Sequence, residues 1–348
     1  MATTSSKILS IAGKTALAAG SVLIAKKLFS ATPKGTGKAE PARNKVVLIT
    51  GGSRGLGLAL AQELGSLGYR LALCARDTAE LEEACRRLAE MNIEAVPITC
   101  DVTKQHEISS LLERVLERFG RIDILVNNAG IIKVGPLENF EHADFEHAMD
   151  LMFWAPVNLT LAVLPHMKKQ GSGEIVNITS IGGRVSVPHL LPYSCAKFAL
   201  TGFSTGLSVE VKSDHIHVLT VIPGLMRTGS YLNAEFTGEA GREFAWFGLL
   251  GNLPGFSVSA EYAAKCIRLA LERKRYTCTI SLPAKLLVAS EALMPEVTRS
   301  ALQFINSTFL PAGKENQSAK GKQLNPSFGK LFQAVTSLGK AAALRYNE

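Results

Sequence analysis

Short runs of apolar residues alternate along most of the chain with segments whose apolar positions recur at helical spacing. The first run, Val46 to Ile49, has no polar position, and the later runs also lack the alternation of a half-exposed strand. Buried strands separated by helices of about ten to fifteen residues are typical of a parallel sheet covered on both faces. The predicted strands are 46–49, 70–74, 95–99, 122–126, 174–179, 217–222 and 277–281, and the predicted helices are 56–67, 78–91, 107–119, 142–169, 192–213 and 259–273. The pattern therefore predicts an α/β fold with a doubly wound parallel sheet over residues 45–281.

The first 44 residues follow a different pattern. Residues 8–29 are mostly apolar, and their few polar side chains, among them Lys14 and Ser21, form a narrow stripe. A lysine at the centre of a membrane span is disfavoured by about 2.5–3.5 kcal/mol, so a helix lying on a membrane surface is favoured over one that crosses it. An organellar transit segment is the alternative. Residues 1–44 are thus predicted to be a basic apolar helix and a linker.

Two further segments follow the predicted sheet. Residues 282–311 contain two apolar stretches and are predicted to form a helical extension of the domain. Residues 312–348 are predicted to be a flexible basic tail, because residues 312–327 are rich in Gly, Lys, Gln, Asn and Ser. Within this tail, apolar positions between Phe328 and Tyr346 recur at roughly helical spacing, which predicts an amphipathic helix.

The positive charge lies at the two ends of the chain. The formal net charge is +8, but residues 1–44 carry seven Lys and Arg against one acid, and residues 312–348 carry six against two, so the body between them has a net charge of −2. A nucleic-acid groove would need a basic domain surface, which this body lacks. The six cysteines form no CxxC pair and no metal-ligand spacing. We therefore predict no nucleic-acid partner, no metal site and a cytoplasmic, reducing location, with peripheral membrane contact through residues 8–29.

A glycine-rich turn joins the first predicted strand to the first predicted helix. It reads Thr50-Gly51-Gly52-Ser53-Arg54-Gly55-Leu56-Gly57. Small residues at such a turn let the backbone approach a pyrophosphate, whose charge is stabilised by the helix N-terminus. The turn therefore predicts a dinucleotide site.

The choice between the two nicotinamide dinucleotides depends on the end of the second strand, where an acid would bind the ribose hydroxyl of NAD. Arg76 stands at that end, and Arg54 lies in the glycine turn. Two guanidinium groups favour a 2′-phosphate. The sequence therefore predicts NADP(H) and disfavours NAD(H), although Asp77 could reach back to the ribose.

Three residues carry the candidate chemistry. Tyr193 and Lys197 are four residues apart on a predicted helix, and so on one face of it, and Ser180 precedes them at the end of a predicted strand. A tyrosine with its ordinary pKa of about 10 is a poor base near neutral pH, and the Lys197 ammonium is expected to lower the pKa of Tyr193. Ser180 would hydrogen-bond a substrate oxygen, and Tyr193 would exchange a proton with that oxygen as hydride moves to or from the cofactor.

Together these features resemble the short-chain dehydrogenase/reductase family over residues 45–281. The matching segments are Thr50-Gly51-xxx-Gly55-x-Gly57, Cys100-Asp101-Val102, Asn127-Asn128-Ala129-Gly130, Ser180, Tyr193-xxx-Lys197 and Pro223-Gly224. The resemblance implies that Asp101 and Val102 lie by the adenine ring and that Asn127 to Gly130 border the cofactor. It also implies that Lys197 binds the nicotinamide ribose and that Pro223-Gly224 with Thr228 holds the carboxamide.

The predicted site has two parts. The predicted catalytic residues are Ser180, Tyr193 and Lys197. The predicted cofactor-binding residues are Thr50, Gly51, Ser53, Arg54, Gly55, Leu56, Gly57, Arg76, Asp101, Val102, Asn128, Ala129, Gly130, Tyr193, Lys197, Pro223, Gly224 and Thr228. Relatives in the family often pair through the long helix and the Tyr193 helix, which implies a homodimer or a homotetramer.

One position departs from the family pattern. The family has an asparagine in the long helix that kinks it and holds a water for proton relay to Lys197, and here that position is Met152. Methionine can do neither by hydrogen bonding. Two interpretations compete: an enzyme whose relay uses other waters or backbone carbonyls, and an NADP(H)-binding scaffold or redox sensor with little turnover.

The segment that would cover the substrate is strongly apolar. The large apolar residues after Gly224 are Leu225, Met226, Tyr231, Leu232, Phe236, Phe244, Trp246, Phe247, Leu249, Leu250, Leu253 and Phe256. Such a cover suggests a lipophilic ketone or alcohol, for example a ketoacyl chain, sterol, retinoid or long-chain compound; an ordinary packed helix pair would have the same composition. The sequence therefore predicts an NADP(H)-dependent oxidoreductase that interconverts a carbonyl and a secondary alcohol on a lipophilic small molecule.

Overall fold

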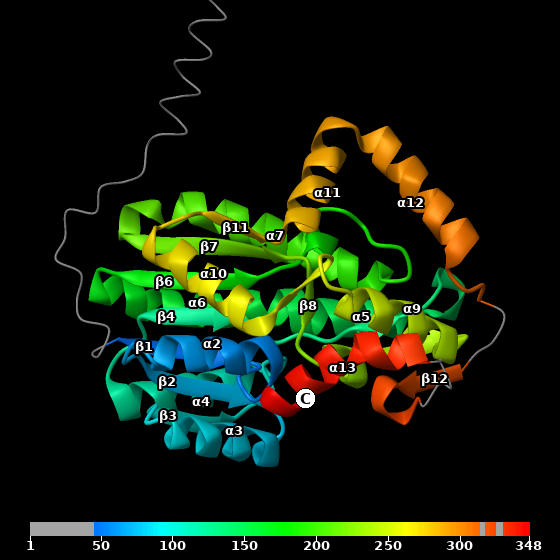
Figure 1. Cartoon of the computed structure of the whole chain (residues 1–348). Helices are drawn as coiled ribbons and strands as arrows, with labels where there is room; N and C mark the ends of the chain where they lie inside the picture. Colours follow the sequence, from blue (N-terminus) through cyan, green and yellow to red (C-terminus); the bar gives the residue numbers. More distant parts are fainter. Residues whose placement is uncertain (1–44, 314–316, 325–329) are drawn as a thin grey trace, which may run out of the picture. The chain divides into compact units, whose positions relative to one another are not determined.

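The computed structural model describes residues 45–313, 317–324 and 330–348 (Figure 1). The helix and linker predicted in residues 1–44, and with them the membrane contact and the transit segment, lie outside the described residues and stay predictions.

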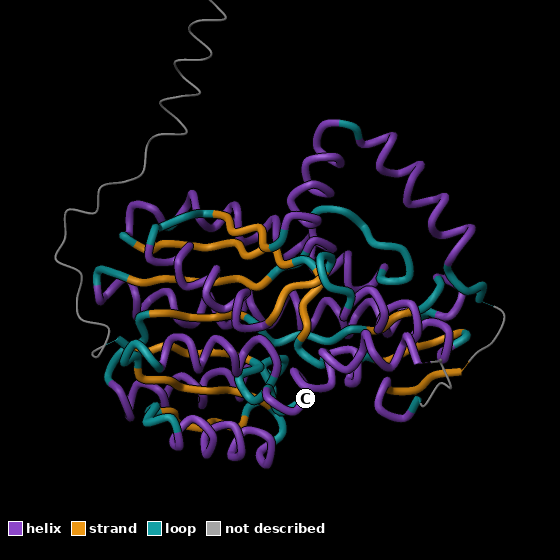
Figure 2. The backbone as a smooth tube through the Cα atoms, viewed as in Figure 1, coloured by secondary structure: helices purple, strands orange, loops and turns teal. Residues whose placement is uncertain are grey.

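A seven-stranded parallel sheet forms the centre of the described chain (Figures 1 and 2). Its strands are β1 Val46–Thr50, β2 Arg70–Ala75, β3 Ala95–Thr99, β4 Ile124–Asn127, β6 Gly173–Ile178, β7 Ile216–Pro223 and β11 Thr277–Ile280. They lie in the order β11-β7-β6-β4-β1-β2-β3. The chain winds outward from β1 to β3 and then crosses back to β4 beside β1, which confirms the predicted doubly wound α/β fold. Ligands of such sheets bind outside the carboxyl ends of the strands at the crossing point.

Helices cover both faces of this sheet. They are α2 Gly55–Gly65, α3 Thr78–Glu90, α4 Gln105–Phe119, α6 Ala155–Gln170, α7 Leu191–Glu210 and α10 Ala260–Glu272. The buried strand β1 explains why the pattern lacks alternation: Val46 and Leu48 pack into the core with α4, α6 and α7. Val47 and Ile49 point to the opposite face and pack with α2, α3 and α10.

The long helix is interrupted by a π turn. Helix α5, His142–Met149, continues through the π-helical residues Asp150–Trp154 (η3) into α6, and the Ala155 N–H bonds the Asp150 carbonyl, five residues back. In the described part of the chain, the helix over residues 142–170 is the one long and apolar enough to cross a bilayer, but half of its apolar window is buried against the domain. A core helix meets the same criterion, so its composition is explained by packing.

Smaller elements close the carboxyl edge of the sheet. The strands are β5 Lys133–Val134, β8 Leu225–Arg227, β9 Glu235–Gly238, β10 Ser257–Ser259 and β12 Gln317–Lys320, and the helices are α8 Ser230–Asn233, α9 Ala240–Asn252, α11 Leu282–Leu293, α12 Pro295–Phe309 and α13 Lys330–Arg345. Short 3-10 turns are η2 Leu137–Asn139, η4 Ile181–Gly183, η5 Lys212–Asp214 and η6 Gly321–Gln323. The short strands form two further sheets, β10-β8 and β12-β9-β5. Their brevity and mixed composition explain why the sequence pattern did not predict them.

The described part of residues 312–348 is packed on the domain and does not form the flexible tail that its composition suggested. Strand β12 pairs antiparallel with β9. After α13, Tyr346 is 1% exposed and packs into the core on the α2 side of the sheet. The polar composition did not predict this packing. Strand β12 is stabilised by its pairing with β9, and α13 is stabilised by contacts of a few small and aromatic side chains.

We expect Gly57→Ala to destabilise the fold, because a Cβ at Gly57 would lie 2.0 Å from the Gly51 carbonyl oxygen and 2.7 Å from Asn128 Nδ2. The Gly51 carbonyl belongs to the turn itself and cannot move aside without opening it. Overpacking of this kind costs about 1–3 kcal/mol or more, measurable as a lower free energy of unfolding in urea. The control is Gly202→Ala on an exposed face of α7, where nothing lies within 4 Å; equal loss in both variants would contradict this explanation.

Candidate active site

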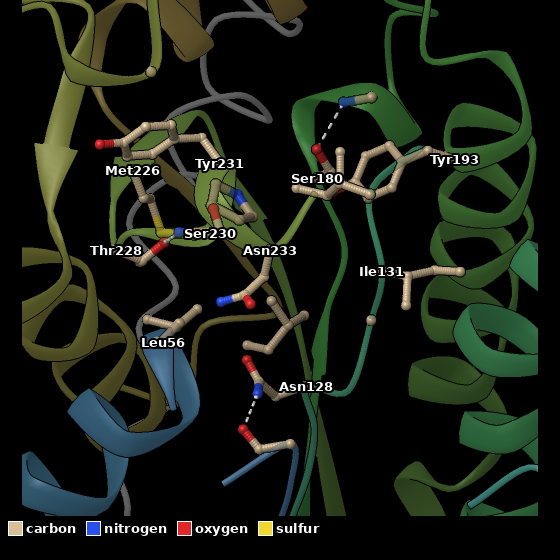
Figure 3. Close-up of a pocket in the computed structure, with 18 of the residues that line it drawn as sticks. Leu56, Asn128, Ile131, Ser180, Tyr193, Met226, Thr228, Ser230, Tyr231 and Asn233 are labelled. Carbon is tan, nitrogen blue, oxygen red and sulfur yellow. Dashed lines mark hydrogen bonds between the residues drawn. The ribbon is translucent and has the colours of Figure 1, made fainter. Parts of the chain in front are cut away.

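One large cavity opens at the carboxyl ends of β1, β4, β6 and β7. Its volume is about 990 Å³, at the upper end of the range of small-molecule and cofactor sites. Figure 3 shows Ser180 and Tyr193 on one side of this cavity, Thr228, Ser230 and Asn233 across from them, and Leu56 and Asn128 at the end near the glycine turn. The cavity thus lies where doubly wound sheets bind their ligands.

The glycine turn is held to the end of β4 by hydrogen bonds. Asn128 Nδ2 donates to the carbonyls of Thr50 at 2.9 Å and Gly51 at 3.1 Å, and Figure 3 draws one of these two bonds. The Thr50 hydroxyl accepts from the N–H groups of Asn128 at 3.0 Å and Ala129 at 3.1 Å. Gly51 and Gly55 both have positive φ, which suits residues without a side chain. These bonds fix the turn with the N-terminus of α2 facing the cavity, and no side chain caps that terminus.

Ser180, Tyr193 and Lys197 meet in the cavity as predicted from their spacing. Ser180 follows β6, and its hydroxyl accepts from the Gly182 N–H at 3.0 Å and is hydrogen-bonded to Tyr193. Tyr193 lies in the first turn of α7, and Lys197 lies one turn further on. The Lys197 Nζ donates to the Ile178 carbonyl at 2.8 Å and is 5.8 Å from the centre of the Tyr193 ring.

The expected acidic shift of the tyrosine is wrong for this structure. Burial raises the pKa of Tyr193, and the hydrogen bond from Ser180 opposes this without reversing it. Burial lowers the pKa of Lys197 to about 8. The sequence argument counted the lysine charge but not the desolvation of both groups, which disfavours phenolate and ammonium alike. At neutral pH the structure therefore places a protonated phenol beside a lysine that is still mostly charged.

A chain of buried amides and hydroxyls lies beneath the site. Asn127 Nδ2 donates to Asn177 Oδ1 at 2.8 Å and to Thr160 Oγ1 at 3.2 Å. Asn177 Nδ2 donates to Ser204 Oγ at 3.0 Å, and that hydroxyl is 2.7 Å from Thr220 Oγ1. The chain joins β4, β6, α7 and β7, so it fixes the strand ends relative to the helix that carries Tyr193. Sequence reasoning placed Asn127 at the sheet but missed its partner Asn177, which stands between the apolar residues Val176 and Ile178 of β6.

Met152 lies within the π turn, so the helix deviates from α geometry without an asparagine at this position. Its side chain is buried and packs against Gly130, since a Cβ on that glycine would lie 3.5 Å from the Met152 sulfur. The helix is thus distorted at the position where the family pattern has an asparagine, although methionine replaces the asparagine side chain here.

The two arginines at the cofactor end have different surroundings. Arg54 Nη1 is 3.0 Å from Glu80 Oε1, and Arg54 Nε is 3.8 Å from Glu348 Oε2. Arg76 is exposed at the end of β2 and lines the cavity. The Asp77 carboxylate accepts from the Glu80 N–H at 2.9 Å and so caps α3.

The cavity brings most of the predicted residues together. Those that line it are Gly51, Ser53, Arg54, Gly55, Leu56, Arg76, Val102, Asn128, Ala129, Gly130, Ser180, Tyr193, Lys197, Pro223, Gly224 and Thr228. Thr50 and Gly57 do not line it. Thr50 holds the turn to the end of β4 by hydrogen bonds, and Gly57 allows the close approach of the Gly51 carbonyl. Asp101 does not line it either: its carboxylate accepts from the Thr103 N–H and hydroxyl at 3.0 and 2.8 Å, as a turn residue ahead of α4.

Some lining residues were not predicted at all. Among them are Ser230, Asn233, Leu287, Lys320, Lys322 and Glu348, which come from the cover, α11 and the last segments of the chain. No local pattern marks them, because their neighbours in the cavity are far away in sequence.

The apolar cover is divided between cavity and core. Leu225, Trp246, Phe247, Leu250 and Phe256 line the cavity. Phe236 and Phe244 do not line it and pack together in a buried cluster, which Phe247 also joins. Some residues of the cover therefore face the cavity and others form packed core, the two alternatives that its apolar composition allowed.

A buried hydrogen-bonded pair orients the cover over the site. His189 Nδ1 is 2.7 Å from Glu243 Oε1, and the Trp246 indole N–H donates to Glu243 Oε2 at 2.6 Å. Glu243 is fully buried. The pair links the loop before α7 to α9 and fixes the Trp246 ring at the cavity wall.

Comparison with known proteins agrees with this geometry. Residues 45–235 match the family model described as short chain dehydrogenase. The chain is 34% identical over 206 residues to Dehydrogenase/reductase SDR family member 7B of Danio rerio, a match over 58% of this chain and 66% of that protein. It is 36% identical over 187 residues to a putative ketoacyl reductase of Streptomyces coelicolor, a match over 53% and 72%. A solved short-chain dehydrogenase from Streptomyces avermitilis superposes with a TM-score of 0.64 at 32% identity, over 76% of this chain and 97% of that one.

We expect kcat/KM for carbonyl reduction to be constant near neutral pH and to fall as pH rises through about 8, where Lys197 loses its charge. A single deprotonation reduces the rate about tenfold per pH unit above the pKa. A pH series at low substrate concentration measures this profile. A profile that stays flat well above pH 8 would show that the charge on Lys197 is not required.

Proposed function

Because the chain belongs to the short-chain dehydrogenase family, whose members are oxidoreductases that use a nicotinamide cofactor, we propose that it is an NADP(H)-dependent reductase of a lipophilic ketone. The proposal rests chiefly on one observation: Ser180, Tyr193 and Lys197 line the same cavity as the glycine turn. The name of the Streptomyces coelicolor relative, a putative ketoacyl reductase, agrees with a 3-oxoacyl substrate.

The residues present fit a dinucleotide. The N-terminus of α2 carries no side-chain cap and faces the cavity, and such a terminus stabilises an anion. Gly51, Ser53, Gly55 and Leu56 would hold the pyrophosphate, and Asn128 to Gly130 would border the ribose. The bound cofactor would supply the hydride.

The roles of the catalytic residues follow from their protonation states. The Ser180 hydroxyl would hold the carbonyl oxygen of the substrate. The Tyr193 phenol, protonated at neutral pH, would give its proton to that oxygen as the carbonyl carbon is reduced. The Lys197 ammonium would stabilise the phenolate that is left. Because its pKa is raised, Tyr193 keeps its proton at neutral pH, so the proton that carbonyl reduction requires is present in the site.

Proton return to Tyr193 needs a path to solvent through Lys197. The π turn at Met152 supports a path through the backbone, because such a turn leaves carbonyl oxygens without their usual helical partners. Met152 also motivates the second candidate function, a cofactor-binding scaffold or redox sensor with little turnover.

The lining of the cavity supports a lipophilic substrate. Trp246, Phe247 and Leu250 from α9 form its wall together with Phe256 and Leu287. A concave apolar wall with few polar groups suits a hydrophobic chain beside one reacting carbonyl. We also propose that the protein forms a homodimer or a homotetramer. The contacts would be made by the long helix and α7, as in many relatives.

We expect Tyr193→Phe to reduce the rate of NADPH oxidation with a panel of lipophilic ketones by about 10²–10⁴-fold, the usual contribution of a positioned acid. The phenylalanine keeps the ring and removes only the proton donor. Tyr262→Phe, at an exposed tyrosine, is the matched control and should keep full activity. Full activity in Tyr193→Phe would exclude the mechanism. NADPH binding without turnover of any ketone, unimproved by Met152→Asn, would favour the scaffold.

We expect Arg76→Ala to weaken NADPH binding by about 10–100-fold while leaving NADH binding unchanged, because a hydrogen bond to a charged group contributes about 1.5–3 kcal/mol. Titration calorimetry with both cofactors measures the difference. The control is Arg86→Ala on α3, whose side chain pairs with Glu83 and Glu90. Equal losses for both cofactors would contradict a phosphate contact.

A further inference from the structure

The last described residues of the chain enter the cavity at the glycine turn. In Figure 1 the end of α13 lies beside the start of α2. The Gly55 N–H, at the first position of α2, donates to the Tyr346 carbonyl at 2.9 Å. Asn347 Nδ2 donates to the carbonyls of Ser53 at 3.2 Å and Glu80 at 3.1 Å. Residues 346–348 therefore contact the backbone of the turn directly.

Glu348 places a carboxylate over the same turn. Its side chain is 5% exposed. Its Oε2 accepts from Asn233 Nδ2 at 2.7 Å and lies 3.8 Å from Arg54 Nε. Its Oε1 lies 2.5 Å from the position that a Cβ on Gly55 would take, so the carboxylate fills the space that the glycine leaves open.

This space is the one that a dinucleotide needs. In doubly wound folds the pyrophosphate lies at the N-terminus of the helix after β1, close to the glycine backbone. Here that terminus already donates an N–H to Tyr346 and faces the Glu348 carboxylate. A phosphate and this segment cannot occupy the site together, on grounds of both volume and charge.

We propose that residues 346–348 are a built-in competitor of the cofactor: they dock on the glycine turn and must leave before a dinucleotide binds. The proposal rests on the proposed function only in requiring that a dinucleotide binds at this turn. Docking is strengthened by the burial of Tyr346 and by Arg87, whose Nη1 donates to the Leu344 carbonyl at 2.9 Å.

The competition should depend on pH through Glu348. The charged groups that face its carboxylate are Arg54 from the turn and Glu80 from α3, while α8 contributes the neutral Asn233. Burial raises the pKa of the docked Glu348 to about 7, although the charge of Arg54 and the hydrogen bond from Asn233 both act to lower it. A group whose pKa is higher when docked favours docking at low pH, so docking weakens as pH rises toward 7. Cofactor affinity should rise over the same interval.

Four variants measured by calorimetric titration with NADPH test the proposal. At pH 6, Glu348→Ala and deletion of residues 346–348 should lower Kd about tenfold, the factor expected when a competitor is docked about 90% of the time. Glu348→Gln keeps the volume and stays neutral at every pH, so it should dock at least as firmly as the wild type at pH 6, bind NADPH no more tightly there, and lack the gain in affinity that the wild type shows by pH 8. Glu296→Ala on α12, an exposed carboxylate, is the control and should leave Kd unchanged.

A second measurement covers the case in which the shortened protein does not fold. Amide hydrogen exchange of residues 340–348 in the wild type should speed up at saturating NADPH, because the segment leaves the turn. Slower exchange, or an equal or higher Kd in Glu348→Ala, would overturn the proposal and make the segment part of the cofactor site. If cofactor binds with unchanged Kd in every variant, this inference alone fails. If no variant and no wild-type protein binds NADPH or NADH, the proposed function fails with it.

Discussion

The hydrogen bonds that join the glycine turn to the end of β4 are the constraint on which the site depends. Thr50 and Asn128 supply them through one hydroxyl and one amide. They set the N-terminus of α2 at the point where the chain crosses from one half of the sheet to the other. Since Ser180 follows β6, two strands from β1, and Tyr193 and Lys197 lie on α7, these bonds determine how a bound dinucleotide faces Tyr193. The buried chain from Asn127 through Asn177 to Ser204 fixes the remaining distance.

Desolvation rather than ion pairing governs the chemistry of this arrangement. Lys197 is buried and Tyr193 is partly buried, and desolvation moves each toward its neutral form. A neutral phenol holds the proton that reduction requires, so the enclosure that excludes water from the reacting carbonyl also keeps that proton on Tyr193. The same effect acts at the other end of the cavity, where burial raises the pKa of Glu348. One physical cause, desolvation, therefore acts both on the protonation state of Tyr193 and on the carboxylate that docks at the glycine turn.

The sequence predicted what depends on local patterns. Buried runs such as Val46 to Ile49 predicted the sheet, and the i, i+4 spacing predicted that Tyr193 and Lys197 share a face of α7. It could not predict contacts between distant residues of ordinary composition. Glu348 and Asn233 meet at the glycine turn across 115 positions of the chain, and nothing in their neighbourhoods marks them. Desolvation was missed for the same reason, because the burial of Tyr193 results from elements that are far apart in sequence.

Transfer of deuterium tests the central claim most directly. Reduction of a lipophilic ketone with NADPH labelled at C4 of the nicotinamide, followed by mass spectrometry of the alcohol, reports whether hydride passes between the two in this cavity. We predict one deuterium at the carbinol carbon from one of the two C4-labelled forms and none from the other. Alcohol without deuterium from either form, or label that appears equally with the protein omitted, would contradict the proposed reductase.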